Sequence, residues 1–255
     1  MEGNSNWIPR RRIRLAILIA LFFAAVAVMG AVRSPWAWLL LAPAAGAGVA
    51  AFIMLRIKSQ LSAGWQQRIH DLVAERLALT PDARDAVLDI GCGDASLLAT
   101  LLRRAPDIAA TGVDFWGSDW DYAQSACEAR LPDATFHRMD AGQLDVPDAS
   151  FDRVTSVMCF HEVPPRDGVS LPGPLVAVTE ALRVLKPGGR FVLVDRFRDA
   201  RDYGDPAALD AILAATADLH REQLVATLGI PWPLNTKRSL GPVDVLTGRK
   251  PNAPV

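Results

Sequence analysis

Acidic residues and glycines are closely spaced in one short segment of this chain. The run VLDIGCGDAS at 87–96 places Asp89 just before Gly91 and Gly93, at the end of an apolar stretch. This pattern predicts a buried strand that turns at the glycines into a helix. Glycines let the backbone bend sharply and let a ligand approach it, and a helix N-terminus offers free N–H groups and partial positive charge. The segment therefore predicts a binding turn for a carboxylate or a phosphate.

Details of this turn distinguish between two ligand classes. A dinucleotide-binding turn has a third glycine, in the pattern G-x-G-x-x-G, where this chain has Ser96. Asp94 and Asp89 would both place negative charge near a pyrophosphate. A zwitterionic amino acid fits better, because its ammonium can meet carboxylates while its carboxylate meets backbone N–H groups. An NAD-dependent oxidoreductase stays open as an alternative, and it would need the third glycine.

A second group of residues that could do chemistry lies further along the chain. The segment CFHEVPP at 159–165 follows an apolar run and contains His161 and Glu162. A histidine titrates near neutral pH, so His161 is a candidate base for a hydroxyl or a ring carbon, with Glu162 as a second candidate. The structural alternative is that His161 closes a pocket or hydrogen-bonds to a backbone carbonyl.

Alternating strands and helices would position these residues. This pattern predicts an α/β fold with a doubly wound, mostly parallel, seven-stranded sheet, whose ligand lies beyond the carboxyl ends of the strands. The predicted strands are 86–90, 108–113, 135–138, 151–158, 190–194, 237–240 and 243–247. Helices are predicted at 61–79, 95–104, 119–130 and 174–185, with one or two more in 207–228.

Charge is divided unequally along the 255 residues. Residues 1–58 have a net charge of +6 and residues 59–255 a net charge of −7. Hydrophobic residues make up 51% of the chain, which excludes a disordered protein. The acidic second part argues against nucleic acid as a partner. Three cysteines without a C-x-x-C pair, and four histidines without paired spacing in the sequence, predict neither a disulfide framework nor a metal site.

The first 58 residues contain two apolar runs. Leu15–Val32 and Pro35–Leu55 are each close to the 20 or so apolar residues that a membrane-spanning helix needs. The link between them is so short that two helices must run antiparallel. We therefore predict a membrane hairpin in residues 1–58, followed by a separate domain in residues 59–255. A cleaved signal peptide is the alternative for the first run.

The basic residues predict the orientation of this hairpin. Four arginines precede the first run, Arg56 and Lys58 follow the second, and only Arg33 lies in the turn. The positive-inside rule then places both ends, and the domain that follows, in the cytoplasm. Trp36 and Trp38 would lie at the outer interface. The predicted localisation is the cell membrane, with two spanning helices and a cytoplasmic domain.

Four segments in this order resemble the class I S-adenosylmethionine-dependent methyltransferases, in particular their small-molecule and quinone-type branch. The resemblance covers roughly residues 65–250. VLDIGCGDAS (87–96) resembles the first cofactor-binding motif, and TGVDFW (111–116) resembles the second strand with its ribose-binding acid. RMDAGQLDVPDASFDRVTS (138–156) resembles the adenine-binding segment and fourth strand, and RVLKPGGRFVLVD (183–195) the turn into the fifth strand.

The resemblance implies a role for each matching residue in the first two motifs. Gly91 and Gly93 let the loop wrap the methionine part of the cofactor. Asp89 helps to anchor the ammonium, directly or through water, unless it only caps the turn. Asp114 accepts hydrogen bonds from the ribose hydroxyls. Phe115 packs on the adenine, with ordinary core packing as the alternative.

Later residues complete the implied cofactor site. Asp140 would face the adenine edge through its side chain, and Ala141 through its backbone N–H. Met158, at the end of the fourth strand, would line the pocket for the methyl donor. Trp116 and Trp120 either shield the cofactor or pack within the domain.

One position departs from the family pattern, because the chain has Ala95 where many members have glycine. A methyl group is small, so cofactor binding is expected to survive. The hairpin favours a lipid, quinone or isoprenoid-like methyl acceptor, although it could simply localise an enzyme that acts on a soluble molecule. A membrane-anchored protein that binds S-adenosylmethionine without catalysis is a further alternative.

Overall fold

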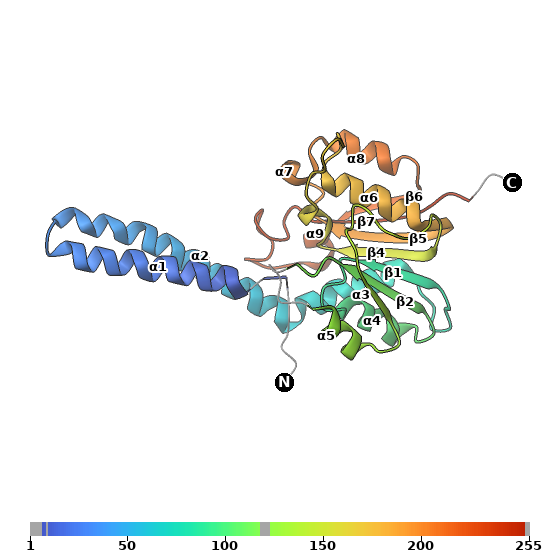
Figure 1. The fold of residues 1–255 in the computed structure, drawn as a ribbon, viewed down its shortest axis with the longest axis horizontal. Coiled ribbons are helices and arrows are strands. Elements are labelled where there is room, and N and C mark those ends of the chain that lie inside the picture. The colour runs from blue at the N-terminus through green and yellow to red at the C-terminus, as the bar shows by residue number, and fades with distance from the viewer. Residues whose placement is uncertain (1–6, 9, 118–122, 253–255) are drawn as a thin grey trace. The chain divides into compact units, whose positions relative to one another are not determined.

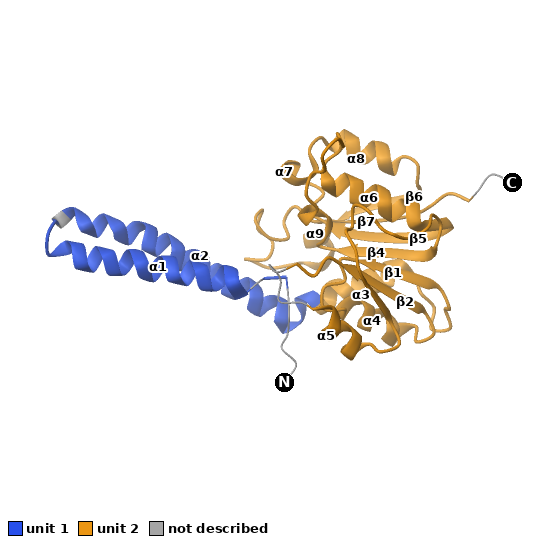
Figure 2. Ribbon diagram, viewed as in Figure 1, with its two compact units in different colours: residues 1–66, 118–121 blue, residues 67–117, 122–255 orange. Residues whose placement is uncertain are grey.

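The computed structural model describes residues 7–8, 10–117 and 123–252. It divides the chain into two compact units, residues 1–66 with 118–121 and residues 67–117 with 122–255 (Figure 2). The division predicted at residue 58, between a membrane hairpin and a cytoplasmic domain, stays a prediction. Each unit is described by itself below.

The first unit contains two long helices that run side by side in opposite directions (Figure 1). Helix α1 spans Arg10–Ala31, and α2 spans Leu41–Gln60 after a 3-10 turn at Pro35–Leu40. Helix α1 begins five residues before the first predicted run, so the arginines that precede this run lie inside its first turns. Helix α2 begins six residues after the start of the second predicted run and continues five residues past its end. Helical backbone continues after α2 through Leu61–Trp65, with a kink at Gly64, where φ is +114°.

Both helices are long and apolar enough to cross a membrane. Only 11% of the most apolar 18-residue window is buried in each of them, whereas the core helix of a soluble protein is mostly buried. Leu21, Phe22 and Phe52 expose 57% or more of their surface. Length and composition therefore agree with the predicted hairpin, and the placement in a membrane is taken up below.

The second unit is built on one seven-stranded sheet with the order β3-β2-β1-β4-β5-β7-β6. The first five strands in this order are parallel, and β7 runs antiparallel to both of its neighbours. The predicted fold class is confirmed. The strands are β1 (Ala86–Ile90), β2 (Ala109–Asp114), β3 (Thr135–Arg138), β4 (Phe151–Val157), β5 (Leu185–Asp195), β6 (Ala217–Gln223) and β7 (Asp244–Arg249).

Helices lie on both faces of this sheet, with α6 and α8 on one side and α3, α4 and α5 on the other (Figure 1). Apolar side chains of β1, β4, β5 and α6 pack together in the buried core. The helices are α3 (Gln66–Leu77), α4 (Ser96–Arg104), α5 (Gln124–Arg130), α6 (Gly173–Val184), α7 (Ala200–Tyr203), α8 (Pro206–Leu213) and α9 (Leu224–Leu228), with a 3-10 turn at Phe160–Glu162.

Four predicted elements differ from the structure. The region 207–228, predicted as helical, contains the edge strand β6 between α8 and α9, and the strand predicted at 237–240 is a turn. The single helix predicted over 61–79 is broken at Gly64, because a φ of +114° cannot continue a regular helix. The helix predicted at 119–130 begins at Gln124, and its first residues, 119–122, lie outside the described part of the chain.

Candidate active site

The glycine turn after β1 requires glycine at its first position. Gly91 has a φ of +75°, and a Cβ there would lie 2.3 Å from both Cβ and Sγ of Cys159, which follows β4. The backbone N–H groups of Gly91 and Cys92 both donate to the carbonyl of Val113 on β2, at 2.7 and 3.1 Å. The turn is therefore held against the ends of two neighbouring strands, at the edge where an α/β sheet binds its ligand.

Asp89 lies at the end of β1 and is 2% exposed. Its Oδ1 makes no hydrogen bond within the part of the chain that the structure describes. Burial, with the added negative charge of Asp114 and Asp94, raises the pKa of Asp89 to about 8. A cation placed next to this carboxyl would favour its ionised form, so the geometry fits the predicted contact with an ammonium group.

Asp114 ends β2 beside the glycine turn and is half-buried. Its Oδ2 accepts a hydrogen bond from the N–H of Gly93 at 2.9 Å, and its Oδ1 accepts one from the N–H of Trp116 at 2.8 Å. Each carboxylate oxygen can accept a second hydrogen bond, so this arrangement orients the carboxylate without using all of its acceptor capacity. The predicted ribose contact is compatible with this geometry.

The two aromatic residues after Asp114 have different surroundings. Phe115 is 59% exposed, which rules out the core-packing alternative, and the Arg138 guanidinium lies 4.9 Å from its ring centroid. The indole N–H of Trp116 donates to the Gly93 carbonyl at 2.9 Å, so this side chain braces the glycine turn. Trp120 lies outside the described residues.

Ala95 has a backbone conformation that favours glycine. It is the residue before α4, it has a left-handed φ of +61°, and it is fully buried. An L-amino acid in this conformation is strained by about 1–2 kcal/mol. The helix nevertheless begins at Ser96, so alanine is accommodated without loss of the turn.

Asp140 has partners that the sequence did not predict. Its Oδ2 accepts a 2.6 Å hydrogen bond from Arg166, and its Oδ1 accepts one from the N–H of Gly142 at 2.8 Å. Arg166 comes from the loop after β4, so an ion pair joins this loop to the predicted adenine-binding segment. Ala141 is half-buried and packs against the core. The predicted adenine contacts of both residues stay predictions.

Met158 opens the loop that follows β4. It is half-buried, it has a left-handed φ of +57°, and its N–H donates to the Val194 carbonyl of β5 at 2.8 Å. An unbranched residue with positive φ is uncommon and marks a local constraint. The turn redirects the chain over the carboxyl edge of the sheet, toward the 3-10 turn that contains His161.

His161 is held by an acid at the end of the next strand. Its Nδ1 lies 2.7 Å from Oδ1 of Asp195, and its backbone N–H donates to Oδ2 of the same carboxylate at 3.2 Å. Asp195 is 1% exposed and the His161 side chain 12% exposed. This contact excludes the alternative in which the His161 ring bonds only to a backbone carbonyl. A carboxylate on Nδ1 favours the tautomer whose Nε2 is the free base.

The surroundings of His161 decide its protonation. Burial lowers the pKa of His161, but the hydrogen bond to Asp195 and the negative charges of Asp195 and Glu162 outweigh it, and the pKa is raised overall. Glu162 lies on the Nε2 side, with its Oε1 3.6 Å away, and is 43% exposed. Tyr203 is buried nearby, and burial with the charge of Asp195 raises the pKa of its hydroxyl well above the usual range.

Two residues of this site were missed by the sequence analysis. Asp195 is 34 residues from His161, and Arg166 is 26 residues from Asp140. A weak signal existed for Asp195, because it is an acid at the end of an apolar strand, as Asp89 and Asp114 are. No comparable signal marks Arg166.

The comparison with protein families agrees with this geometry. The methyltransferase domain family matches residues 87–189, which run from β1 to the beginning of β5. Phosphatidylethanolamine N-methyltransferase of Cereibacter sphaeroides is 32% identical over 150 residues, covering 58% of this chain and 68% of that protein. Demethylmenaquinone methyltransferase of Deinococcus radiodurans is 33% identical over 132 residues, covering 52% of this chain and 49% of that protein.

A solved structure shows the same fold. Phosphoethanolamine N-methyltransferase 2 of Haemonchus contortus, in complex with S-adenosyl-L-methionine, superimposes with a TM-score of 0.52 at 16% identity. The superposition covers 74% of this chain and 53% of that chain. The chain spans about half the length of the first curated relatives that it matches.

The chain belongs to the class I S-adenosylmethionine-dependent methyltransferase family. The family predicted from the four sequence segments, and S-adenosylmethionine as its cofactor, are therefore confirmed. The roles of the individual site residues stay predictions, and the reaction and its acceptor are proposed next.

Proposed function

We propose that this protein is a membrane-anchored enzyme that transfers a methyl group from S-adenosylmethionine to a lipid-like or quinone-like acceptor. The main support for S-adenosylmethionine as the methyl donor is the buried carboxyl of Asp89. It is buried at the end of β1, between the glycine turn and Asp114, and has no hydrogen-bond partner for Oδ1 among the described residues. Without a partner this buried carboxyl avoids the cost of desolvation by staying protonated, and a cationic ligand group beside it would favour its ionised form.

Different residues of this chain would bind different parts of the cofactor. Asp89 would accept from the ammonium, while the turn at Gly91 and Gly93 would hold the carboxylate end near backbone N–H groups. Asp114 would accept from the ribose hydroxyls through its remaining acceptor positions, and the exposed ring of Phe115 would pack on the adenine. When bound, the cofactor supplies an electrophilic methyl group on a sulfonium, so alignment of the acceptor is the main task of the protein.

His161 would take the acceptor's proton. Asp195 holds the Nδ1 side of the ring, which leaves Nε2 as the base, and the burial of both groups fixes the ring. Glu162, 3.6 Å from Nε2, would be the next carboxylate to receive or release that proton. In this arrangement Asp195 is a positioning residue, because it acts on the acceptor only through His161.

Exposed apolar side chains support an apolar acceptor. Phe115 follows β2, and Val169 and Leu171 lie on the loop after β4, so all three are on connections at the carboxyl edge of the sheet. They expose 59%, 44% and 38% of their surface. Relatives of this chain are named for methyl transfer to demethylmenaquinone and to phosphatidylethanolamine, both of which are lipids.

The hairpin supplies the reason for a membrane location. We propose that α1 and α2 span the cell membrane, that both of their outer ends are cytoplasmic, and that residues 59–255 form a cytoplasmic catalytic domain. The four arginines at the start of α1 and the two bases at the end of α2 support this orientation.

A labelled-methyl assay tests this function. The full chain in detergent would be incubated with S-adenosylmethionine labelled on its methyl group and with a total lipid extract or a water-soluble extract. We expect label in the lipid fraction, strongly reduced in Asp89→Asn and in His161→Ala. Label confined to water-soluble material would refute the lipid acceptor, and no transfer to either extract, with cofactor binding intact, would favour a binding protein without catalysis.

A further inference from the structure

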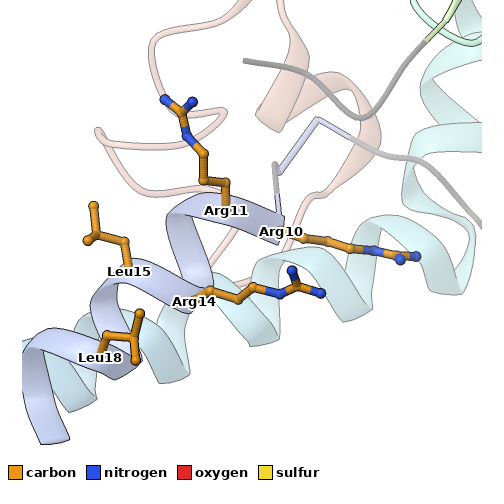
Figure 3. A pocket seen from close by; sticks show the side chains of 5 residues that line it. All are labelled: Arg10, Arg11, Arg14, Leu15 and Leu18. Atoms are coloured by element: carbon orange, nitrogen blue, oxygen red, sulfur yellow. The ribbon is translucent and has the colours of Figure 1, made fainter. Parts of the chain in front are cut away.

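A surface pocket lies at the start of α1. Its volume is about 750 Å³, and it is lined by Arg10, Arg11, Arg14, Leu15 and Leu18. Figure 3 shows Arg10 and Arg14 extended in the same direction, Arg11 directed to another side, and the two leucines further along the helix. All five residues belong to the first unit, and none is part of the site proposed for methyl transfer.

The charge around this pocket is positive. Arg12 adds a fourth guanidinium to the first turns of α1, and the first turn contains no acidic residue. The Nζ of Lys58, near the end of α2, donates to the carbonyl of Ile8 at 3.0 Å, which brings a base of the second helix to the same end of the hairpin. A helix N-terminus is itself partially positive. This end of the hairpin therefore favours an anion.

The order of side chains along α1 matches one kind of anion. Arg10, Arg14 and Leu18 follow each other at intervals of four residues, so they lie on one face of the helix, with Leu15 next to Arg14. From Arg10 to Leu18 the helix rises about 12 Å. Guanidinium groups at one end bind phosphate through paired N–H donors, and Leu15 and Leu18, 57% and 63% exposed, present apolar surface below them.

We propose that this pocket binds an anionic phospholipid, with the phosphate held by Arg10 and Arg14, which extend in the same direction, and the beginning of an acyl chain along Leu15 and Leu18. The proposal rests on the proposed membrane placement of the hairpin, in which the start of α1 lies at the cytoplasmic interface. A free phosphate would use the arginines but not the leucines, so the lipid is the ligand that uses the whole pocket.

The test uses the full chain purified in a neutral detergent, which makes the result independent of membrane orientation. Retained lipid is measured by native mass spectrometry after titration with dioleoylphosphatidylglycerol, which is anionic, or dioleoylphosphatidylcholine, which is zwitterionic. The combined variant Arg10→Gln, Arg11→Gln and Arg14→Gln removes the pocket's charge. A matched control, Arg84→Gln, Arg104→Gln and Arg238→Gln, removes three exposed charges of the second unit.

We expect one phosphatidylglycerol to be retained selectively, and the pocket variant to bind it roughly 10- to 100-fold more weakly while the control is unchanged. Cofactor binding by each variant checks that the second unit is folded. The site is refuted if phosphatidylcholine binds equally, if inorganic phosphate competes as well as the lipid does, or if the control loses as much affinity. Recovery of the chain without detergent would refute the membrane placement, and with it this site, whereas loss of lipid selectivity alone leaves the proposed function intact.

Discussion

The two units of this chain differ in how much of their large apolar side chains is exposed. In the first unit Leu21 and Phe52 expose 61% and 57% of their surface, whereas in the second unit Leu98 and Leu193 are fully buried. Packed side chains surround the large apolar residues of the second unit. In the proposed membrane placement, a bilayer surrounds those of the first unit. Substitutions in the second unit should change folding and cofactor binding, and those in the first should change membrane retention.

The largest expected effect is at the glycine turn of the second unit. In Gly91→Ala, the new Cβ would lie 2.3 Å from Cβ and Sγ of Cys159, so the turn must move. Misplacement of reacting groups by about 1 Å can lower the rate of reaction about 100-fold. We expect methyl transfer to fall by roughly that factor in Gly91→Ala, and S-adenosylhomocysteine to bind more weakly, as measured by calorimetry.

A matched control separates this clash from simple backbone strain. Gly229 also has a positive φ, +64°, but a Cβ there has no atom within 4 Å. Gly229→Ala should lower stability by about 1–2 kcal/mol and leave ligand affinity unchanged. Equal affinity losses in both variants would contradict a specific role for the turn at Gly91.

The next effect concerns the proton acceptor. Because the pKa of His161 is raised in the folded protein and only the neutral ring is a base, wild-type activity should rise with pH through a value above the ordinary 6.5 or so. Asp195→Asn removes the charge that raises this pKa, so the rise should move to lower pH, and the plateau rate should fall about 10- to 100-fold. A lower rate with an unmoved pH profile would mean that Asp195 has only a structural role.

A smaller effect is expected in the first unit, and it concerns membrane retention and not cofactor binding. Leu21→Asp places a charge near the middle of α1, where insertion into a membrane costs about 2.5–3.5 kcal/mol more. We expect less protein in carbonate-washed membranes, with cofactor affinity unchanged. Leu219→Asp, on the exposed edge strand β6, is the control and should leave membrane retention as it is. Equal retention of both variants would argue against a membrane role for α1.

The smallest effect is at Ala95. Glycine tolerates the left-handed φ of +61° that strains alanine, so Ala95→Gly should stabilise the second unit by about 1 kcal/mol, less the loss of a buried methyl group. Urea unfolding measures this change, and cofactor affinity should stay the same. A clear loss of stability would show that the methyl contact outweighs the strain.

Most of the strands that position the site could be predicted from the sequence. Buried parallel strands are short apolar runs, and those at 86–90 and 109–114 end directly in acids or glycines, which is a local pattern. The edge strand β6 could not be recognised, because most of its residues are exposed and it pairs only with β7. Its sequence therefore lacks the apolar run that marks a buried strand.

Contacts between distant segments could not be predicted either. The pairs His161–Asp195 and Asp140–Arg166 join segments that only the sheet topology brings together. Asp89 could be placed at the ligand edge from its motif, but its raised pKa depends on burial and on Asp114, which lies on another strand. The sequence therefore indicates which groups are present, and the fold decides which of them are paired.

In the proposed site the buried Asp89 carboxyl receives the ammonium of the cofactor, and calorimetry of S-adenosylhomocysteine in buffers of different ionisation enthalpy tests this contact. With a pKa raised to about 8, Asp89 is mostly protonated at pH 7, and an ammonium beside it should cause release of up to one proton on binding. We predict a binding enthalpy that depends on the buffer in wild type and no such dependence in Asp89→Asn. If wild type releases no proton on binding, or if Asp89→Asn releases as much as wild type, the contact between Asp89 and the ammonium is contradicted.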